Sequence, residues 1–357
     1  MKLLDRYILK QFLGSFIFTV LIIVSVIVVI DLTEKTEKYV KAELTTGQIF
    51  GYYMDFIPWI ANFITPLTVF IATVFVTSRL AGRTEIIAIL SSGVSFIRML
   101  YPYFIGSVMI AVLSFILTGW IIPNSNKTKR EFELEYLKGR YFFDKTNIHM
   151  QVAKGKYLYM RSYNNQSNMG YNFTLESVDS TKLTEKLSAS RITWNEELQK
   201  WTLMNWSHHT IDGDKEVITE GKSMDTTLVI HPSEFGNLEK NYEGMTIPEL
   251  NDEIDKLTLR GASNVEFYQV EKYTRFTSPF AVLILTFMGV IVSARKSRGG
   301  TGFQIALGFL LSFLYIFFFI MTKSIAEAGG MPPIISVWIP NIIFGGIALL
   351  MYKYVPR

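Results

Sequence analysis

Few side chains in this sequence are spaced for covalent chemistry, and none forms a credible nucleophile–base set. His208 and His209 are adjacent, so a strand would point them to opposite faces, which disfavours a metal site. Asp212 and Asp214 flank Gly213 in a pattern typical of a hairpin turn. The chain contains no P-loop motif and no cysteine. We therefore predict neither an enzyme nor a cofactor or metal held by this chain.

The stretch Arg79–Arg98 indicates a surface that binds another protein. Its apolar run is far too short to cross a membrane. Glu85 falls in the first turn of a predicted short helix over 84–92, where a helix favours negative charge, and Gly93 follows as a stop. Basic residues bracket the stretch at Arg79, Arg83 and Arg98. The pattern favours a surface helix that another protein binds, and the alternative is a connecting loop that happens to be helical.

The composition sets the class of protein around this stretch. The chain has 357 residues, of which 49% are hydrophobic and 18% are charged, with a mean hydropathy of +0.26. This is too apolar for an ordinary soluble protein and too charged for one that lies only in the membrane. The net charge of +4 gives no indication of nucleic-acid binding.

Uncharged apolar runs long enough to cross a bilayer predict six transmembrane helices. As drawn, the runs hold no Asp, Glu, Lys, Arg or His, which argues against an ion-coupled transporter. The runs are Phe12–Ile30, Phe56–Ser78, Met99–Ile122, Phe276–Ala294, Phe303–Thr322 and Ile335–Tyr352.

Between the third and fourth runs, short alternating segments from Tyr141 to His231 predict antiparallel β structure, either a sandwich or an open roll. Thr246 and Glu249 form a capping box that opens a helix. Basic residues flank the membrane at the amino terminus, in the Arg79–Arg98 stretch, around Arg295 and at the carboxyl terminus. The positive-inside rule therefore predicts that both termini are cytoplasmic and that the β insert lies on the opposite side.

The chain resembles the lipopolysaccharide-export permease family LptF/LptG over nearly its whole length, and its opening is more similar to LptG. The resemblance rests on several short motifs in order, none of them specific alone. They are Leu4-Asp5-Arg6-Tyr7-Ile8, Thr84-Glu85 with Ser92-Gly93, Gly119-Trp120 with Pro123, Tyr268-Gln269 with Pro279, and Pro332-Pro333-Ile334 with Pro340. One departure is Asp31, where some LptG members carry a lysine.

The resemblance implies an α+β membrane protein with a periplasmic β-jellyroll inserted between transmembrane helices 3 and 4. Residues 1–123 hold helices 1–3, 124–245 the jellyroll, 246–274 a periplasmic helical linker and 275–357 helices 4–6. It also implies a multi-pass protein of the inner membrane of a Gram-negative bacterium. Helices 1 and 5 would form gates through which lipid enters.

The implied partners are a cytoplasmic ATPase dimer, a second permease chain (a paralogue or a second copy), periplasmic β-jellyroll bridge proteins and lipopolysaccharide. The ATPase, not this chain, would use ATP and Mg²⁺. Coupling to it would involve Arg83, Glu85 and Gly93.

The lipid itself calls for basic residues at the outer rim of an apolar cavity, because its headgroup carries phosphates. Candidates are Lys35, Lys38, Lys41, Lys272, Arg275 and Lys323, each of which could instead anchor the membrane interface. In the β domain, we predict that Leu158, Met160, Phe173 and Leu175 include lipid-facing positions. Two other functions remain open: an ATP-coupled permease for another lipid or lipoprotein, and a non-transporting scaffold.

Overall fold

A computed structural model gives the structure of the chain. The residues that it describes are 3–137, 146–179, 182–212, 215–228, 230–232, 241–259, 265–294 and 300–353. The predicted basic turn around Arg295, the Asp212-Gly213-Asp214 turn in part, and the carboxyl-terminal residue Arg357 lie outside these ranges.

The chain divides into two compact units. The first, a helical unit, comprises Met1–Leu137, Tyr242–Leu250 and Glu266–Arg357, and the second, the β unit, comprises Lys138–Asn241 and Asn251–Val265. Within the described residues, six helices are long and apolar enough to cross a membrane. This confirms the predicted architecture of six apolar helices with a β domain inserted after the third.

The helices of the first unit differ in length from the apolar runs that predicted them. α1 has 39 residues, about 58 Å at 1.5 Å per residue, which is nearly twice the thickness of a bilayer core. Its carboxyl-terminal end therefore extends well past the apolar run. The helices are α1 (Leu3–Lys41), α2 (Thr46–Phe63), α3 (Thr65–Gly82), α4 (Glu85–Ser91), α5 (Phe96–Ile116), α6 (Ile122–Phe132), α7 (Ile247–Leu259), α8 (Val265–Ser293), α9 (Gly300–Glu327) and α10 (Pro333–Lys353).

The second predicted span, Phe56–Ser78, was placed wrongly. The helix breaks at Ile64, and only α3 has the length and hydropathy of a span. Pro66 stands in the first turn of α3, where proline lacks the N–H that would continue α2. α2 has its own capping box, in which Thr45 and Gln48 satisfy each other's backbone N–H groups. The residues just before Phe56, which the predicted span left out, are therefore helical from Thr46 onward.

The third span also continues beyond its predicted end at Pro123. A π-helical turn, Leu117–Ile121, joins α5 to α6, and Pro123 falls in the first turn of α6. Proline is tolerated there because the π-helical turn before it already departs from α-helical hydrogen bonding, so the missing N–H interrupts no regular i→i−4 ladder. One continuous helical segment therefore runs from Phe96 to Leu137.

Close helix packing in the first unit depends on glycine. A Cβ at Gly106 of α5 would lie 2.6 Å from the ring of Phe12 on α1. A Cβ at Gly308 of α9 would lie 2.8 Å from Phe70 on α3. Small residues are favoured between membrane helices because dispersion contacts, not expulsion of water, hold such helices together.

The six spans are buried to very different degrees. In the most apolar stretch of each helix, 67% of α3 and 56% of α8 is buried, so these two form the centre of the unit. The corresponding values are 11% for α1 and 22% for α9. Few side chains in the apolar stretches of these two helices are fully buried by the rest of the chain.

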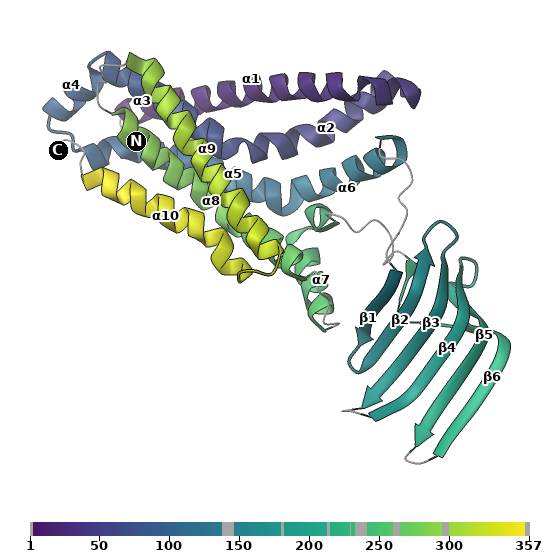
Figure 1. Ribbon diagram of the computed structural model, residues 1–357. Helices are drawn as coiled ribbons and strands as arrows, with labels where there is room; N and C mark the ends of the chain where they lie inside the picture. The colour runs from purple at the N-terminus through teal and green to yellow at the C-terminus, as the bar shows by residue number, and fades with distance from the viewer. Residues whose placement is uncertain are drawn as a thin grey trace. The chain divides into compact units, whose positions relative to one another are not determined.

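The second unit is built on one six-stranded antiparallel sheet in which the described strands follow chain order, β1-β2-β3-β4-β5-β6 (Figure 1). Each strand pairs antiparallel with the next strand along the chain, which is the arrangement of a meander. The strands are β1 (Thr146–Ala153), β2 (Lys156–Asn164), β3 (Met169–Asp179), β4 (Lys182–Asn195), β5 (Lys200–Asp212) and β6 (Lys215–Thr226).

A crease crosses this sheet from strand to strand. Ordinarily every second residue of a strand faces the core, but Ala189 and Ile192 of β4 are both buried although three residues apart. The same spacing separates Met160 from Tyr163 on β2. The strand register is nevertheless kept on both sides of the crease. Three asparagines with positive φ lie in this row, on alternate strands: Asn147 (54°), Asn172 (49°) and Asn205 (47°).

Candidate coupling site and lipid path

The short helix α4 is where the sequence predicts docking. It covers Glu85–Ser91, inside the predicted range 84–92, and ends at Gly93, whose φ of 84° favours glycine. Thr84, which begins it, has a φ of 61°, an unusual conformation for a β-branched residue. Such strain costs on the order of 1–3 kcal/mol and is concentrated at functional sites. α4 lies at the same end of the helical unit as the start of α1 and the end of α10 (Figure 1).

Glu85 is partly exposed and has two partners. Its carboxylate accepts a hydrogen bond from the Tyr7 hydroxyl at 3.2 Å and lies 3.9 Å from Nη1 of Arg83. Ile86 is buried in the helical core, whereas Ile87 is 56% exposed. α4 thus has one anchored face and one face that presents an apolar side chain to its surroundings.

A second contact joins the same elements. Asp5 of α1 is only 3% exposed, and its Oδ2 accepts a hydrogen bond from Nη2 of Arg98 at 2.7 Å. Arg98 lies in the first turn of α5, which Ser95 caps by accepting the Arg98 backbone N–H. The residues that follow α4 are therefore tied to the beginning of α1.

At the other end of α1, Lys35 belongs to a connected polar cluster. Its Nζ lies 2.8 Å from Asp31 and 2.5 Å from the Tyr52 hydroxyl, which in turn donates to Glu133 at 3.2 Å. The Tyr53 hydroxyl donates to Asp31. Burial is the main cause that raises the pKa of the Tyr52 and Tyr53 hydroxyls, so both stay protonated donors at neutral pH. The cluster fastens α1 to α2.

The other predicted rim lysines have varied surroundings. Lys38 is exposed on α1, and the exposed Lys41 pairs with Glu37 at 2.6 Å. Lys272 lies beside the ring of Tyr273. Lys323 of α9 is within 3.6 Å of Glu271 and 3.8 Å of Glu327. Contact of any of these residues with lipid stays a prediction.

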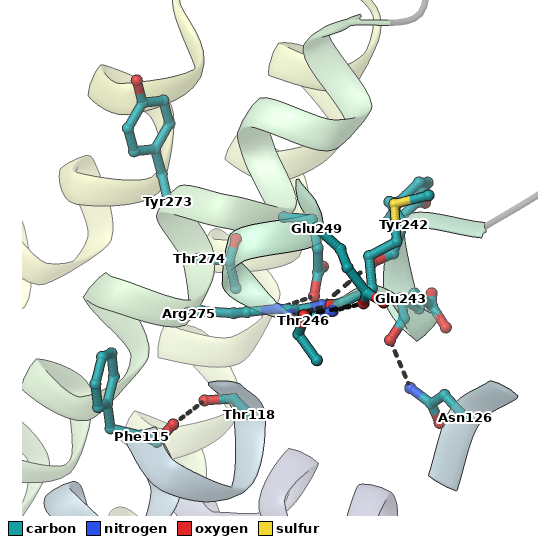
Figure 2. A network of polar contacts seen from close by, with 12 residues as sticks. Phe115, Thr118, Asn126, Tyr242, Glu243, Thr246, Glu249, Tyr273, Thr274 and Arg275 are labelled. Carbon is teal, nitrogen blue, oxygen red and sulfur yellow. Dashed lines mark hydrogen bonds and ion pairs between the residues drawn. The ribbon is translucent and has the colours of Figure 1, made fainter. Parts of the chain in front are cut away.

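Arg275, the sixth predicted rim residue, points into the protein. It is 3% exposed and donates to Glu271 at 3.0 Å and to the carbonyl oxygens of Met245 at 2.5 Å and Tyr242 at 3.2 Å (Figure 2). In this structure its guanidinium holds the segment before α7 against α8.

The same segment is held from α6. The Asn126 amide donates to the Glu243 carbonyl, and Lys127 pairs with Glu249 at 2.9 Å. Glu249 also accepts the backbone N–H of Thr246, so one half of the predicted capping box is present (Figure 2). That hydrogen bond and then Lys127 lower the pKa of Glu249 to about 2. We call the segment 242–249 the clasp, because α6 and α8 hold it from two sides.

The four predicted lipid-facing residues of the β domain are neighbours. Leu158 pairs with Leu175, and Met160 pairs with Phe173, across β2 and β3. Three of them are buried and Leu175 is partly buried, in one cluster with Trp201. The Trp201 indole donates to the carbonyl of Ile230, so the chain after β6 lies over part of this apolar face. Here these side chains form a packed core, and lipid contact stays a prediction.

Reasoning from the sequence missed the partners of its own site residues. Tyr7 was part of a recognised motif, but nothing local indicates that it meets Glu85, 78 residues away. Glu271 was left outside the fourth predicted span, although α8 begins at Val265 and includes it. Glu271 lies 4 residues from Arg275 and 52 residues from Lys323, and these spacings become informative only once the helices have been placed.

Comparisons with known proteins agree with this architecture. A family model described as lipopolysaccharide export system permease LptF/LptG matches residues 6–354. The lipopolysaccharide export system permease protein LptG of Haemophilus influenzae is 21% identical over 345 residues, covering 96% of this chain and 95% of that protein. The LptG protein of Escherichia coli K12 is 17% identical over 350 residues, covering 97% of this chain and 96% of its own length. Both relatives are LptG proteins, as the opening of the chain suggested.

Proposed function

This chain belongs to the family of lipopolysaccharide export system permeases LptF/LptG, and from this premise we propose that it is one permease subunit of an ATP-driven transporter. It takes lipopolysaccharide from the outer leaflet of the inner membrane and passes it to a periplasmic bridge protein. Both chain ends and α4 face the cytoplasm, and the β unit is periplasmic.

The observation that supports this most directly is the low burial of α1 and α9 in their apolar stretches, 11% and 22%. A permease that admits lipid from the side needs helices whose apolar faces are not already covered by its own chain. A second permease chain, either a paralogue or another copy, covers part of these faces. Lipid enters between the two chains, where α1 and α9 act as gates.

The energy of ATP hydrolysis is coupled to this chain through α4. Its anchored face buries Ile86, and its other face offers Ile87 with Glu85 at the edge. A separate cytoplasmic ATPase dimer receives this surface, with Glu85 and Arg83 at the contact and Gly93 ending the helix. ATP and Mg²⁺ are bound by that partner.

The basic residues at the outer ends of α1, α8 and α9 serve the phosphates of the lipid. Lys38 and Lys41 are the most accessible of them, because the four others are partly or fully buried. The acyl chains then pass over the apolar face of the β sheet, since water contact costs about 0.8 kcal/mol for each methylene. For Leu158, Met160 and Phe173 to meet lipid, the chain that covers this face must move aside.

The test is a reconstituted complex of this chain, its permease partner and its ATPase in proteoliposomes. Lipopolysaccharide should stimulate ATP hydrolysis, and a matched amount of phospholipid should not. Photo-crosslinkers at Leu158 and Phe173 should capture lipopolysaccharide only when ATP is supplied. Stimulation by a different lipid or by a lipoprotein would support the alternative cargo, and hydrolysis that no lipid alters would support a scaffold.

The docking role of Glu85 is tested separately. Glu85→Ala should leave the chain in the membrane but weaken its association with the ATPase, whereas Glu37→Ala, an exposed acid at the far end of α1, should not. Normal transport by an Arg83→Ala, Glu85→Ala double variant would contradict docking at α4.

A further inference from the structure

We propose that the first turns of α1 form a rigid joint with α4 and α5, through which movement of α4 is passed along α1. The joint consists of Asp5, Tyr7, Glu85 and Arg98. The inference rests on the proposed ATPase coupling but concerns the step after docking, namely how displacement of a short surface helix reaches a membrane span.

Two polar contacts attach the first turns of α1 to the chain before and after the turn at Gly93, which follows α4. Tyr7 donates to Glu85 on α4 at 3.2 Å, and Asp5 accepts from Arg98 on α5 at 2.7 Å. Asp5 and Tyr7 lie two residues apart on one helix, while Glu85 and Arg98 stand before and after the Gly93 turn. The end of α1 therefore cannot follow α5 without also following α4.

The Asp5–Arg98 pair is costly in isolation, which argues for a specific role. Asp5 is 3% exposed, and buried charge is tolerated only with a well-placed partner. Nη1 of Arg98 is also buried and has no hydrogen-bond partner among the described residues. Because a buried pair can often be replaced by apolar side chains without loss of stability, stability alone does not account for this pair, and we assign it the role of fixing α1 against α5.

Apolar packing makes the joint stiff. Ile8 and Phe12, one and two turns further along α1, are 1% and 0% exposed. The Phe12 ring lies against Gly106 of α5 so closely that an added Cβ would be 2.6 Å away. Ile86 of α4 belongs to the same core. This end of α1 thus moves as one body with α4 and α5.

Beyond Phe12, one face of α1 is left uncovered by its own chain. Ile17, Phe18 and Leu21 are between 56% and 65% exposed. Another face packs on α2, where Val24 is buried in an apolar cluster, and Asp31 and Lys35 add polar contacts further along. Because a continuous helix is stiff, a displacement at the joint is carried along α1 to its contacts with α2.

The joint is tested in the reconstituted complex by measuring lipopolysaccharide released per ATP hydrolysed. This ratio does not depend on how much complex folds, so a merely structural role would leave it unchanged. Asp5→Asn and Arg98→Met should each lower it by about fivefold, within the range found for residues that carry coupling. ATPase association should stay within about twofold of the parent. Glu253→Gln, which breaks an ordinary exposed pair in α7, is the matched control.

Tyr7→Phe removes one hydroxyl and serves as a second variant if Asp5→Asn fails to fold. A smaller fall in the same ratio is expected, because the Asp5–Arg98 pair remains. A ratio equal to that of the parent in both Tyr7→Phe and a folded Asp5 variant would overturn the joint.

The natural absence of cysteine permits a rescue experiment. In an Asp5→Cys, Arg98→Cys variant, a reversible bis-methanethiosulfonate crosslinker should restore the ratio, and reductant should abolish it again. If the crosslinked complex hydrolyses ATP but releases no lipid, the two helices must separate during transport, and a rigid joint is wrong. If instead Glu85→Ala neither weakens docking nor changes hydrolysis, the proposed ATPase coupling fails independently of these results.

Discussion

The charge of Arg275 is evident from the sequence, but its structural role could not be predicted from the sequence. A basic side chain near the outer end of a span fits phosphate binding and interface anchoring equally well. The structure gives it carbonyl partners 30 and 33 residues earlier in the chain, in the clasp. No local pattern indicates such partners, because backbone carbonyls are present at every position.

We predict that Arg275→Met destabilises the helical unit by about 3 kcal/mol, since it removes one member of a buried ion pair and the donor of two carbonyl groups. Glu271 would keep only Lys323, at 3.6 Å, and two clasp carbonyls would lose their donor. Thermal unfolding in detergent measures the change. Lys272→Met, at the next basic position on α8, should shift the melting temperature little.

Glu249 gives a pH prediction at the same scale. Its pKa is lowered to about 2 by the Thr246 N–H and by Lys127, so folding favours the charged carboxylate. Its contribution to stability is therefore complete above the ordinary glutamate pKa and is lost as the pH falls towards 2. Protection of the amides at the start of α7, measured as the hydrogen-exchange rate relative to the intrinsic rate at the same pH, should fall between about pH 4.5 and pH 2. In Glu249→Gln this fall should be absent, with lower protection already at pH 6.

At the scale of elements, the apolar helices could be predicted and their ends could not. A run of uncharged residues identifies a span because the bilayer core requires it. The end of a helix depends on whether the chain breaks or keeps its helical conformation near a residue such as proline. Pro66 and Pro123 have opposite outcomes. Pro66 follows a real break at Ile64, while Pro123 is absorbed by a π-helical turn in a continuous helix. The identity of the residue alone does not distinguish these cases.

The crease in the sheet was also hidden from the sequence. The alternation of apolar and polar residues predicted the strands. Part-way along a strand, the set of residues that faces the core shifts by one position, and this looks like an irregular pattern until neighbouring strands are aligned. Only the pairings show that Asn147, Asn172 and Asn205 share one row. Asparagine is one of the few residues that adopt a left-handed conformation at low cost.

Substitution of Asn172 tests whether the crease depends on the tolerance of asparagine for a left-handed backbone conformation. Asn172→Val should destabilise the β unit by about 1–2 kcal/mol, since a β-branched residue is strained at a φ of 49°. Asn172→Gly has no such strain and should remain close to the parent. Chemical denaturation followed by tryptophan fluorescence reports on this unit through Trp201, and equal destabilisation by both variants would contradict the strain explanation.

At the scale of the whole molecule, the six apolar helices, the inserted β domain and the family could be predicted because their signals are spread over many residues. The lipid path could not, because it depends on which surfaces remain open. Of the six rim candidates, three lysines have acidic partners, Arg275 is buried, and Lys272 is partly buried beside the ring of Tyr273. Lys38 is exposed, and the structure records no partner for it among the described residues.

Lys38 should therefore affect bound lipid most clearly. Lys38→Glu is expected to lower the lipopolysaccharide that co-purifies with the chain by about tenfold, because a charge-assisted hydrogen bond contributes about 1.5 kcal/mol. Mass spectrometry of the extracted lipid measures the loss. Lys256→Glu, on α7, provides a charge-matched control, and equal lipid in both variants would make Lys38 an interface anchor.

The chain-order arrangement of the six strands has a consequence for biogenesis. Every strand finds its partner in the residues made immediately before or after it, so the sheet has low contact order and little loop-closure entropy to overcome. Pairing can start while the ribosome is still translating, without waiting for α8, α9 and α10. The first three spans would then be followed by a domain that is already folded when the last three insert, and slow synthesis just after residue 226 should be better tolerated than slow synthesis within the strands.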